Sequence, residues 1–211
     1  MSSLPSAVSL PRLAHWSNKP TWEKALDLII GCGWIVYATL YLNNALHGQG
    51  WANWGLFLFY TLVAFLFIFR RPARKTAPWW QTLVAFADAI WPVLWLRATN
   101  SGWFGGHILQ GLAMALMIAA TFSLGLSFGI APADRGLRTQ GVYRWIRHPL
   151  YAGELLFYVG YCLVHPSWHN VIGGLISFIW VRLRIKWEEA ILHGYEAYAQ
   201  QVPWRLLPFI W

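Results

Sequence analysis

Charged side chains are scarce in this sequence of 211 residues: Asp, Glu, Lys and Arg together make up only 11% of it. Soluble domains carry about 25% charged residues. Hydrophobic residues reach 57%, and a chain this short cannot hide so much apolar surface in an interior of its own. The same composition excludes a disordered chain, which combines low hydrophobicity with high charge. We therefore predict a polytopic membrane protein.

Cysteine is also rare, since the sequence contains only Cys32 and Cys162, both in apolar stretches. This number excludes a disulfide scaffold, and we expect both to be buried free thiols. His165 and His169 have a metal-like spacing of four, but no thiol or carboxylate is near them in the sequence, so we expect no metal site. Residues 1–20 are polar and Pro-rich, which does not indicate a cleavable signal peptide.

Long apolar stretches recur along the first 128 residues, and a membrane span needs about 20 such residues. The candidates are Trp22–Leu42, Trp54–Phe69, Trp79–Leu96 and Trp103–Phe128. Two shorter stretches predict a tilted helical hairpin, and a charged amphipathic segment follows: Leu150–Val164, Val171–Trp180 and Lys186–Gln201. We predict an all-α fold, a polytopic membrane helical bundle of four spans plus a C-terminal hairpin, with five or six transmembrane helices. The whole chain, 1–211, is one membrane domain with a four-helix part at 1–128.

Positive charge is unevenly distributed along the chain, which has a net charge of +8. Of the 16 Lys and Arg residues, 15 fall at the N-terminus, after the second predicted helix, after the fourth and in the C-terminal region, and only Arg97 lies elsewhere. These groups share one side if four spans precede a hairpin that returns. The positive-inside rule then puts both termini in the cytoplasm, so we expect a multi-pass protein of a bacterial inner membrane. Such charge indicates contact with membrane lipids rather than nucleic acid.

The first polar cluster lies in the last third of the chain. It reads Tyr143-Arg-Trp-Ile-Arg147-His148-Pro149-Leu-Tyr151-Ala-Gly153-Glu154. Pro149 can occupy the first turn of a helix, where its missing N–H costs nothing. Arg147 and His148 then lie beside the free N–H groups of a helix N-terminus, which bind anions. An interfacial Arg/His pair that holds lipid headgroups is equally consistent with this spacing.

A second polar cluster follows the predicted hairpin. It reads Arg182-Leu-Arg184-Ile-Lys186-Trp-Glu188-Glu189 and continues to Tyr195 and Tyr198. A solvated helix face with i,i+4 ion pairs is the ordinary explanation, although carboxylates also bind ribose hydroxyls in dinucleotide sites. Asp88 lies within a predicted span, so it faces the bundle and has either a structural or a substrate and proton role. We expect Asp27 to lie near an interface and to be solvated.

The two clusters together resemble a known family. Arg147-His148-Pro149-Leu-Tyr151-Ala-Gly153 resembles the RHPxYxG motif of the isoprenylcysteine carboxyl methyltransferase family, and Glu188-Glu189, Tyr195-Glu-Ala-Tyr198 and Val202-Pro203-Trp-Arg-Leu-Leu-Pro208 resemble its C-terminal signature. The resemblance covers about residues 125–211. It implies an integral membrane methyltransferase without a Rossmann domain. It also implies S-adenosyl-L-methionine in a cytoplasm-facing pocket and a substrate that enters from the bilayer.

The resemblance also assigns residue roles, with 129–211 as the cofactor-binding catalytic part. The residues implied to bind the cofactor are Tyr143, His148, Pro149, Tyr151, Gly153, Glu188, Glu189 and Tyr198. The implied catalytic residues are Arg147, Arg182 and Arg184, because an arginine at this place can hold the carboxylate of the substrate. The acceptor is expected to be lipophilic or membrane-embedded, of the carboxylate or thiol class. An isoprenylated protein, a lipid, a small thiol and a lipophilic carboxylic acid all remain open.

Two alternative functions remain at this point. The sterol reductases share a similar RHP segment and a related C-terminal end, so an NADPH-dependent membrane reductase is the first. The short chain and the pair Glu188-Glu189 favour the methyltransferase over it. The second is a non-enzymatic membrane protein whose arginine clusters bind lipid. The sequence does not indicate an oligomeric state.

Overall fold

A computed structural model of the chain describes residues 19–99 and 102–208. Seven α-helices form most of these residues: α2 Thr21–Leu46, α3 Ala52–Phe69, α4 Trp79–Trp95, α5 Gly105–Leu124, α6 Pro149–Val164, α7 Trp168–Ile191 and α8 Tyr195–Gln201. The remaining elements are the 3-10 helices η1 Gly125–Ser127 and η2 Gly141–Arg144, and the strands β1 Lys75–Thr76 and β2 Ala133–Asp134, which pair antiparallel. The predicted all-α fold is therefore confirmed.

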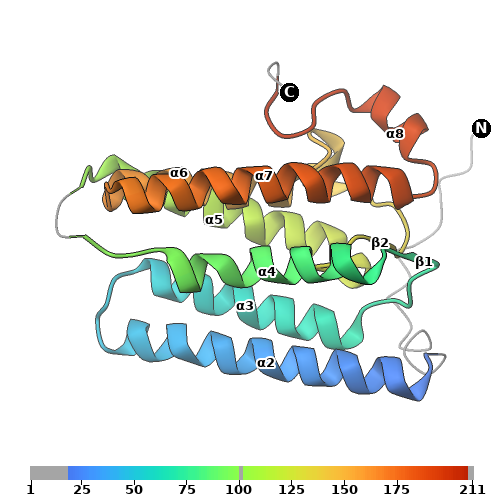
Figure 1. Cartoon of the computed structure of the whole chain (residues 1–211), viewed down its shortest axis with the longest axis horizontal. Coiled ribbons are helices and arrows are strands. Elements are labelled where there is room, and N and C mark those ends of the chain that lie inside the picture. Colours follow the sequence, from blue (N-terminus) through green and yellow to red (C-terminus); the bar gives the residue numbers. More distant parts are fainter. Residues whose placement is uncertain (1–18, 100–101, 209–211) are drawn as a thin grey trace, which may run out of the picture.

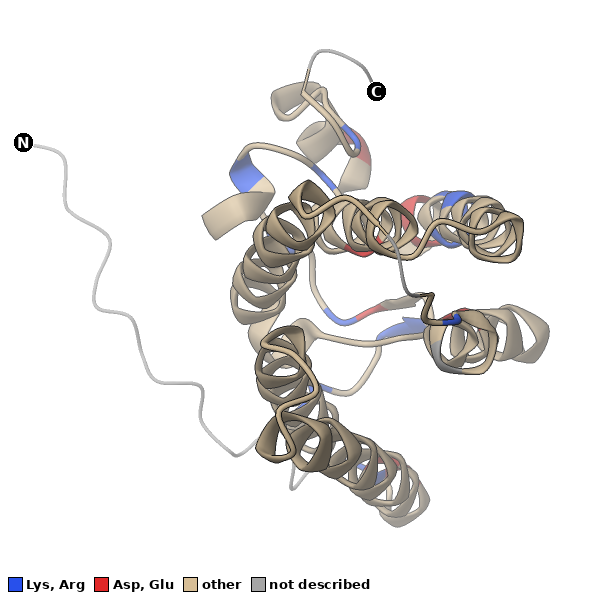
Figure 2. Ribbon diagram, turned by 90° about the vertical axis from the view of Figure 1, so that its left-hand side faces the viewer, with Lys and Arg blue, Asp and Glu red and all other residues tan. Residues whose placement is uncertain are grey.

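Helices α2 to α7 lie side by side along one axis and alternate in direction (Figure 1). They pack chiefly as the pairs α2 with α3, α5 with α6 and α4 with α7. Figure 2 looks along the helices and shows these pairs end-on. The start of α2, the end of α3, both strands and the start of α6 lie at one end of the bundle, where α8 also packs (Figure 1). The basic loops therefore share one end.

Large apolar side chains cover the outside of the bundle. Those that are more than half exposed include Ile29, Val36, Phe65, Leu94, Leu112 and Phe122. Helices α2 and α3, and α5 extended by η1, are long and apolar enough to cross a membrane, and α6 is a shorter apolar helix. An apolar surface of this extent requires lipid around it, so the chain is a membrane protein.

Glycine brings α5 and α6 into close contact. A Cβ atom at Gly160 would lie 2.9 Å from the carbonyl oxygen of Gly106, and one at Gly153 would lie 3.1 Å from the carbonyl oxygen of Ala113. Small residues at such positions let two helix backbones approach closely within a membrane. Gly153, which the resemblance assigns to the cofactor, therefore faces the backbone of α5.

The C-terminal hairpin differs from its prediction. Helix α7 has 24 residues and includes the whole Arg182–Glu189 cluster, because helical backbone continues beyond the apolar stretch. The side chain of Ser167 caps its first turn by accepting the N–H of Asn170. The chain then turns at Gly194, whose φ of 76° favours glycine, and restarts as α8. The charged segment Lys186–Gln201 is thus divided between the end of α7 and α8.

Two expectations for single residues are also wrong. Cys32 is exposed on the outside of α2, and Cys162 is half-buried, although both are free thiols as expected. Asp27 is fully buried rather than solvated. Its carboxylate accepts hydrogen bonds from the Nζ of Lys19 and, at 2.9 Å, from the Nε of Arg70, because the end of α3 returns beside the start of α2.

Candidate functional site

The C-terminal segment is docked on the loop that precedes α6. The backbone N–H of Arg147 donates to the carbonyl oxygen of Trp204 at 2.8 Å, and that of His148 donates to Arg205 at 2.9 Å. His148 is the N-cap residue of α6, and Pro149 starts the helix as predicted. The loop before α6 and the segment around Trp204 and Arg205, more than 50 residues apart in the sequence, therefore form one surface, which we call the C-terminal wall.

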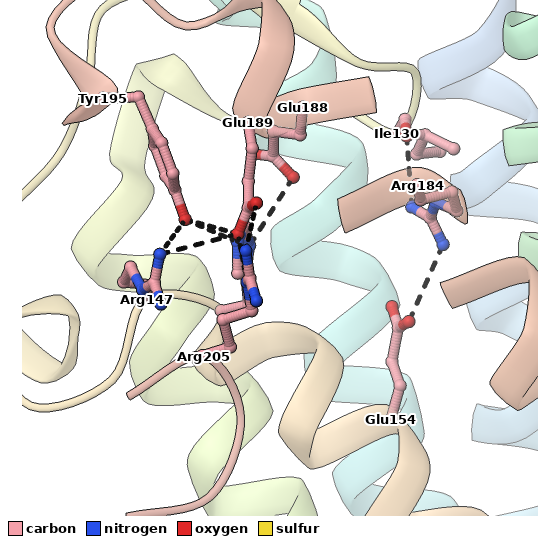
Figure 3. A network of polar contacts seen from close by, with 9 residues as sticks. Ile130, Arg147, Glu154, Arg184, Glu188, Glu189, Tyr195 and Arg205 are labelled. Carbon is pink, nitrogen blue, oxygen red and sulfur yellow. Dashed lines mark hydrogen bonds and ion pairs between the residues drawn. The ribbon is translucent and has the colours of Figure 1, made fainter. Parts of the chain in front are cut away.

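Glu189 is the centre of a polar network at this wall (Figure 3). Its Oε1 accepts from the hydroxyl of Tyr195 at 2.6 Å and from the Nε of Arg205 at 2.9 Å, and lies 3.2 Å from the Nε2 of His148. The Nη2 of Arg205 donates to Oε2 at 3.1 Å. The Nη1 of Arg147 donates to the Tyr195 hydroxyl at 3.1 Å. This carboxylate is fully engaged by its protein partners.

The electrostatics of the network hold Glu189 ionised. Burial raises the pKa of its carboxyl, but the hydrogen bonds from His148, Arg205 and Tyr195 outweigh burial and hold the pKa well below its ordinary value. The bond to Glu189 in turn raises the pKa of Arg205. Glu189 therefore serves as an anchor for the wall.

A small cavity of about 40 Å³ opens beside this network. Its lining includes Arg138, Tyr143, Arg147, His148, Glu188, Tyr195 and Tyr198. The Glu188 side chain is 29% exposed, and its Oε2 lies 3.9 Å from the Nδ1 of His148. The hydroxyl of Tyr198 donates to the carbonyl oxygen of Tyr143 at 2.5 Å, and burial raises the pKa of Tyr198 to about 12.

The chemistry of this lining fits S-adenosyl-L-methionine, which carries a carboxylate, an ammonium, ribose hydroxyls and an adenine ring. Arg138 and Arg147 suit the carboxylate, Glu188 suits the ammonium or the ribose, and tyrosine rings suit the adenine. The volume of about 40 Å³ holds little more than a water molecule. The side chains that line the cavity must therefore move apart to admit S-adenosyl-L-methionine.

A second polar cluster lies deeper in the bundle, around Arg184 (Figure 3). Its Nη1 donates to Asp88 Oδ2 at 2.8 Å and lies 3.7 Å from Glu154 Oε2. Its Nη2 donates to the carbonyl oxygen of Ile130 at 3.1 Å. The guanidinium also lies over the ring of Tyr151, 4.8 Å from its centroid. Arg184 and Asp88 are both buried, so Asp88 has a structural partner.

The Arg184 cluster borders a cavity of about 450 Å³ between the helices. Other side chains of its lining come from α2, α3, α5 and α6, among them Trp34, Phe59, Tyr60, Gln110, Phe157 and Tyr158. Pockets for small molecules have this size and combine an apolar lining with a few polar groups. The cavity can therefore hold a lipophilic molecule with one polar group at the Arg184 cluster.

The structure brings most of the implied site residues together. Arg147, His148, Glu188 and Glu189 meet at the C-terminal wall with Tyr143 and Tyr198 beside them. Tyr151 contacts both clusters, because its ring lies 5.7 Å from that of His148 and beneath Arg184. Arg182 and Arg184 point in different directions, and Arg182 is exposed.

Sequence reasoning missed three members of the two clusters. Arg205 and Tyr195 were assigned no role, although both lie in the C-terminal signature. The motif gives Glu154 no role either, although it lies three residues after Tyr151 and shares a helix face with it. That spacing could have indicated that Glu154 continues the line of functional side chains into the bundle.

Comparison with known proteins adds one finding. Residues 102–201 match the model of the family described as phospholipid methyltransferase. No curated protein matches the chain. The matched residues extend from the start of α5 to the end of α8, and thus include the RHPxYxG segment and Glu188–Tyr198 but not Val202–Pro208.

Proposed function

We propose a specific reaction for the chain, from the premise that residues 102–201 match the phospholipid methyltransferase family. It transfers a methyl group from S-adenosyl-L-methionine to a lipophilic or membrane-embedded acceptor. The observation that carries the proposal is the pair of cavities, one polar and one apolar, whose linings Tyr151 joins through its contacts with His148 and Arg184.

Side chains of the two cavity linings follow one another along each hairpin helix. On α6, His148, Tyr151 and Glu154 follow at intervals of three residues and share a face. On α7, Arg184 and Glu188 are four residues apart and share a face as well. The methyl donor in the small cavity and the acceptor in the large one would therefore meet at Tyr151.

Methyl transfer from a sulfonium is a direct displacement at carbon, and the cofactor supplies the electrophilic methyl group. Such a step depends on alignment of the reactants and on exclusion of water. Glu188 and His148 would hold the cofactor from the polar side, while Glu189 and Arg205 keep the wall closed. Tyr151, which is only 6% exposed, contacts His148 of the small cavity and Arg184 of the large one, and its ring would help to exclude water there.

Binding of the cofactor tests the proposal directly. Calorimetry on the purified chain in detergent should show saturable binding of S-adenosylhomocysteine and none of NADPH. Glu188→Gln should weaken this binding, whereas Glu196→Gln, at an exposed position on α8, should not. Binding of NADPH alone would identify a reductase, and binding of neither would identify a lipid-binding protein.

A further inference from the structure

The charges at the end of the large cavity do not balance. Two carboxylates, Asp88 and Glu154, face one guanidinium, Arg184. Glu188 adds a further carboxylate one turn along α7. The uncharged groups near this cluster are Tyr151, Tyr158 and Ser177. The polar end of the cavity therefore holds more acidic than basic groups, in a region of low dielectric constant.

Arg184 is already engaged by the protein. Nη1 donates to Asp88, Nη2 donates to the carbonyl oxygen of Ile130, and the guanidinium face lies on Tyr151. Its Nε is buried and has no hydrogen-bond partner in the part of the chain that the structure describes, but the guanidinium already faces two carboxylates, so an anionic acceptor would be a third acidic group at one cation. The geometry therefore opposes the hypothesis from the sequence that Arg184 holds the carboxylate of the substrate.

Glu154 differs from Asp88 in its access to the cavity. Its Oε2 lies 3.7 Å from Arg184 Nη1, which is longer than a hydrogen bond. Both carboxylates line the large cavity, but the Glu154 side chain is 27% exposed, against 5% for Asp88. Glu154 is thus the carboxylate that a bound acceptor can reach.

We propose that Glu154 accepts the proton that the acceptor loses on methylation, so that the nucleophile of the acceptor arrives with its proton. Such a nucleophile is an amine, an alcohol or a thiol rather than a carboxylate. An acceptor that arrives as an ammonium first gives one proton to an oxygen of Glu154, which frees the lone pair of its nitrogen. An alcohol or a thiol gives up its proton to Glu154 as the new bond forms. In each case the lone pair of the nucleophile forms the bond to the methyl carbon while the carbon–sulfur bond of the donor breaks and leaves its electron pair on sulfur. This inference rests on the proposed methyl transfer and narrows its acceptor.

Head-group preference can be measured without turnover. Radiolabelled dodecylamine and dodecanoate have the same chain and opposite charges at pH 7.5, and their saturable binding can be compared on the chain in nanodiscs. The wild type should bind dodecylamine more tightly. Glu154→Gln should reduce the ratio of the two affinities about tenfold, the effect of about 1.4 kcal/mol from one lost charge contact. Glu196→Gln, which removes an exposed carboxylate on α8, should leave the ratio unchanged.

The outcomes separate this inference from the proposed function. Equal or tighter binding of dodecanoate, or an unchanged ratio in Glu154→Gln, would overturn the role of Glu154. Failure of both probes to bind saturably would overturn the large cavity as the acceptor site, and with it this inference. The function itself fails only if S-adenosylhomocysteine does not bind in the calorimetric test.

The pH dependence of the methylation rate tests the proton transfer to Glu154. With methyl-labelled S-adenosylmethionine and a lipid extract of the expressing cells, the wild-type rate should fall at low pH as Glu154 is protonated. Glu154→Gln should lower kcat and abolish this fall, while Glu154→Asp should retain it. The affinity for S-adenosylhomocysteine should stay the same in all three proteins. A low-pH fall that persists in Glu154→Gln would show that another group takes the proton.

Discussion

His148 lies where the loop before α6, the end of α7 and the C-terminal segment meet. It is 4% exposed, and its ring nitrogens contact Glu189 at 3.2 Å and Glu188 at 3.9 Å. His148→Ala should weaken the binding of S-adenosylhomocysteine by about 5- to 150-fold, since an unpaired buried partner costs about 1–3 kcal/mol. Calorimetry measures this change. His193→Ala, at an exposed residue between α7 and α8, is the matched control, and an unchanged affinity in folded His148→Ala would reject the role.

Glu189 predicts how stability depends on pH. Its pKa is lower in the folded than in the unfolded chain, so its contribution is complete above the ordinary glutamate pKa of about 4.3 and is lost as the pH falls toward the folded value. Glu189→Gln should melt at a lower temperature than the wild type at pH 7, and the difference should shrink below about pH 4. Thermal melts in detergent across this range measure the effect. Parallel melting curves at a constant separation would contradict it.

At the residue scale, motifs identify functional side chains only where these are close together in the sequence. His148 and Glu188 could be predicted because each lies in a compact motif. The Asp88–Arg184 pair could not, because its members are 96 residues apart and meet only when α4 packs on α7. The role of Gly153 was assigned from a motif, whereas its packing against α5 depends on the neighbouring helix.

At the element scale, the contact of α5 with α6 depends on glycine. Gly160→Leu should destabilise the chain by about 1–3 kcal/mol, because its Cβ would lie 2.8 Å from Gln110 Cγ and 2.9 Å from a backbone carbonyl oxygen of α5. A lowered melting temperature measures this loss. Gly33→Leu is the control, because no atom lies within 4 Å of its Cβ position on the outside of α2. Equal effects of the two substitutions would show that the contact is not close-packed.

Helix positions could be predicted better than helix lengths. The apolar stretches mark the cores of α2 to α6 to within a few residues, because burial in lipid requires continuous hydrophobicity. By the same criterion α7 would end at Trp180, whereas it extends to Ile191. Hydropathy cannot predict this end, since charged residues at a membrane boundary continue a helix as readily as they end it. The break at Gly194 comes from backbone conformation, which hydropathy does not report.

At the scale of the whole molecule, charge asymmetry predicts orientation. The basic loops and α8 lie at one end of the bundle (Figure 1), and the loop between α2 and α3 lies at the other. Reporter fusions after residue 208 and at residue 48 should report the cytoplasm and the opposite side, respectively. A C-terminal reporter found outside would reject both this orientation and entry of the cofactor from the cytoplasm.

The large cavity is the feature of the whole molecule that no sequence pattern contains. Its walls come from six helices, and each contributes ordinary apolar side chains such as Trp34, Phe59 and Phe157. These residues could equally fill a solid core, since hydropathy reports burial but not the space left between helices. The volume depends on how far apart the helix pairs stand, which only the packed structure defines.

The docking of the C-terminal segment has a consequence for limited proteolysis. The wall of the small cavity needs the carbonyl oxygens of Trp204 and Arg205 as well as the guanidinium of Arg205. Helix α8 ends at Gln201, so these groups follow the last helix that the structure describes. A single cut between α8 and Trp204 would therefore separate them from the bundle and leave every described helix intact.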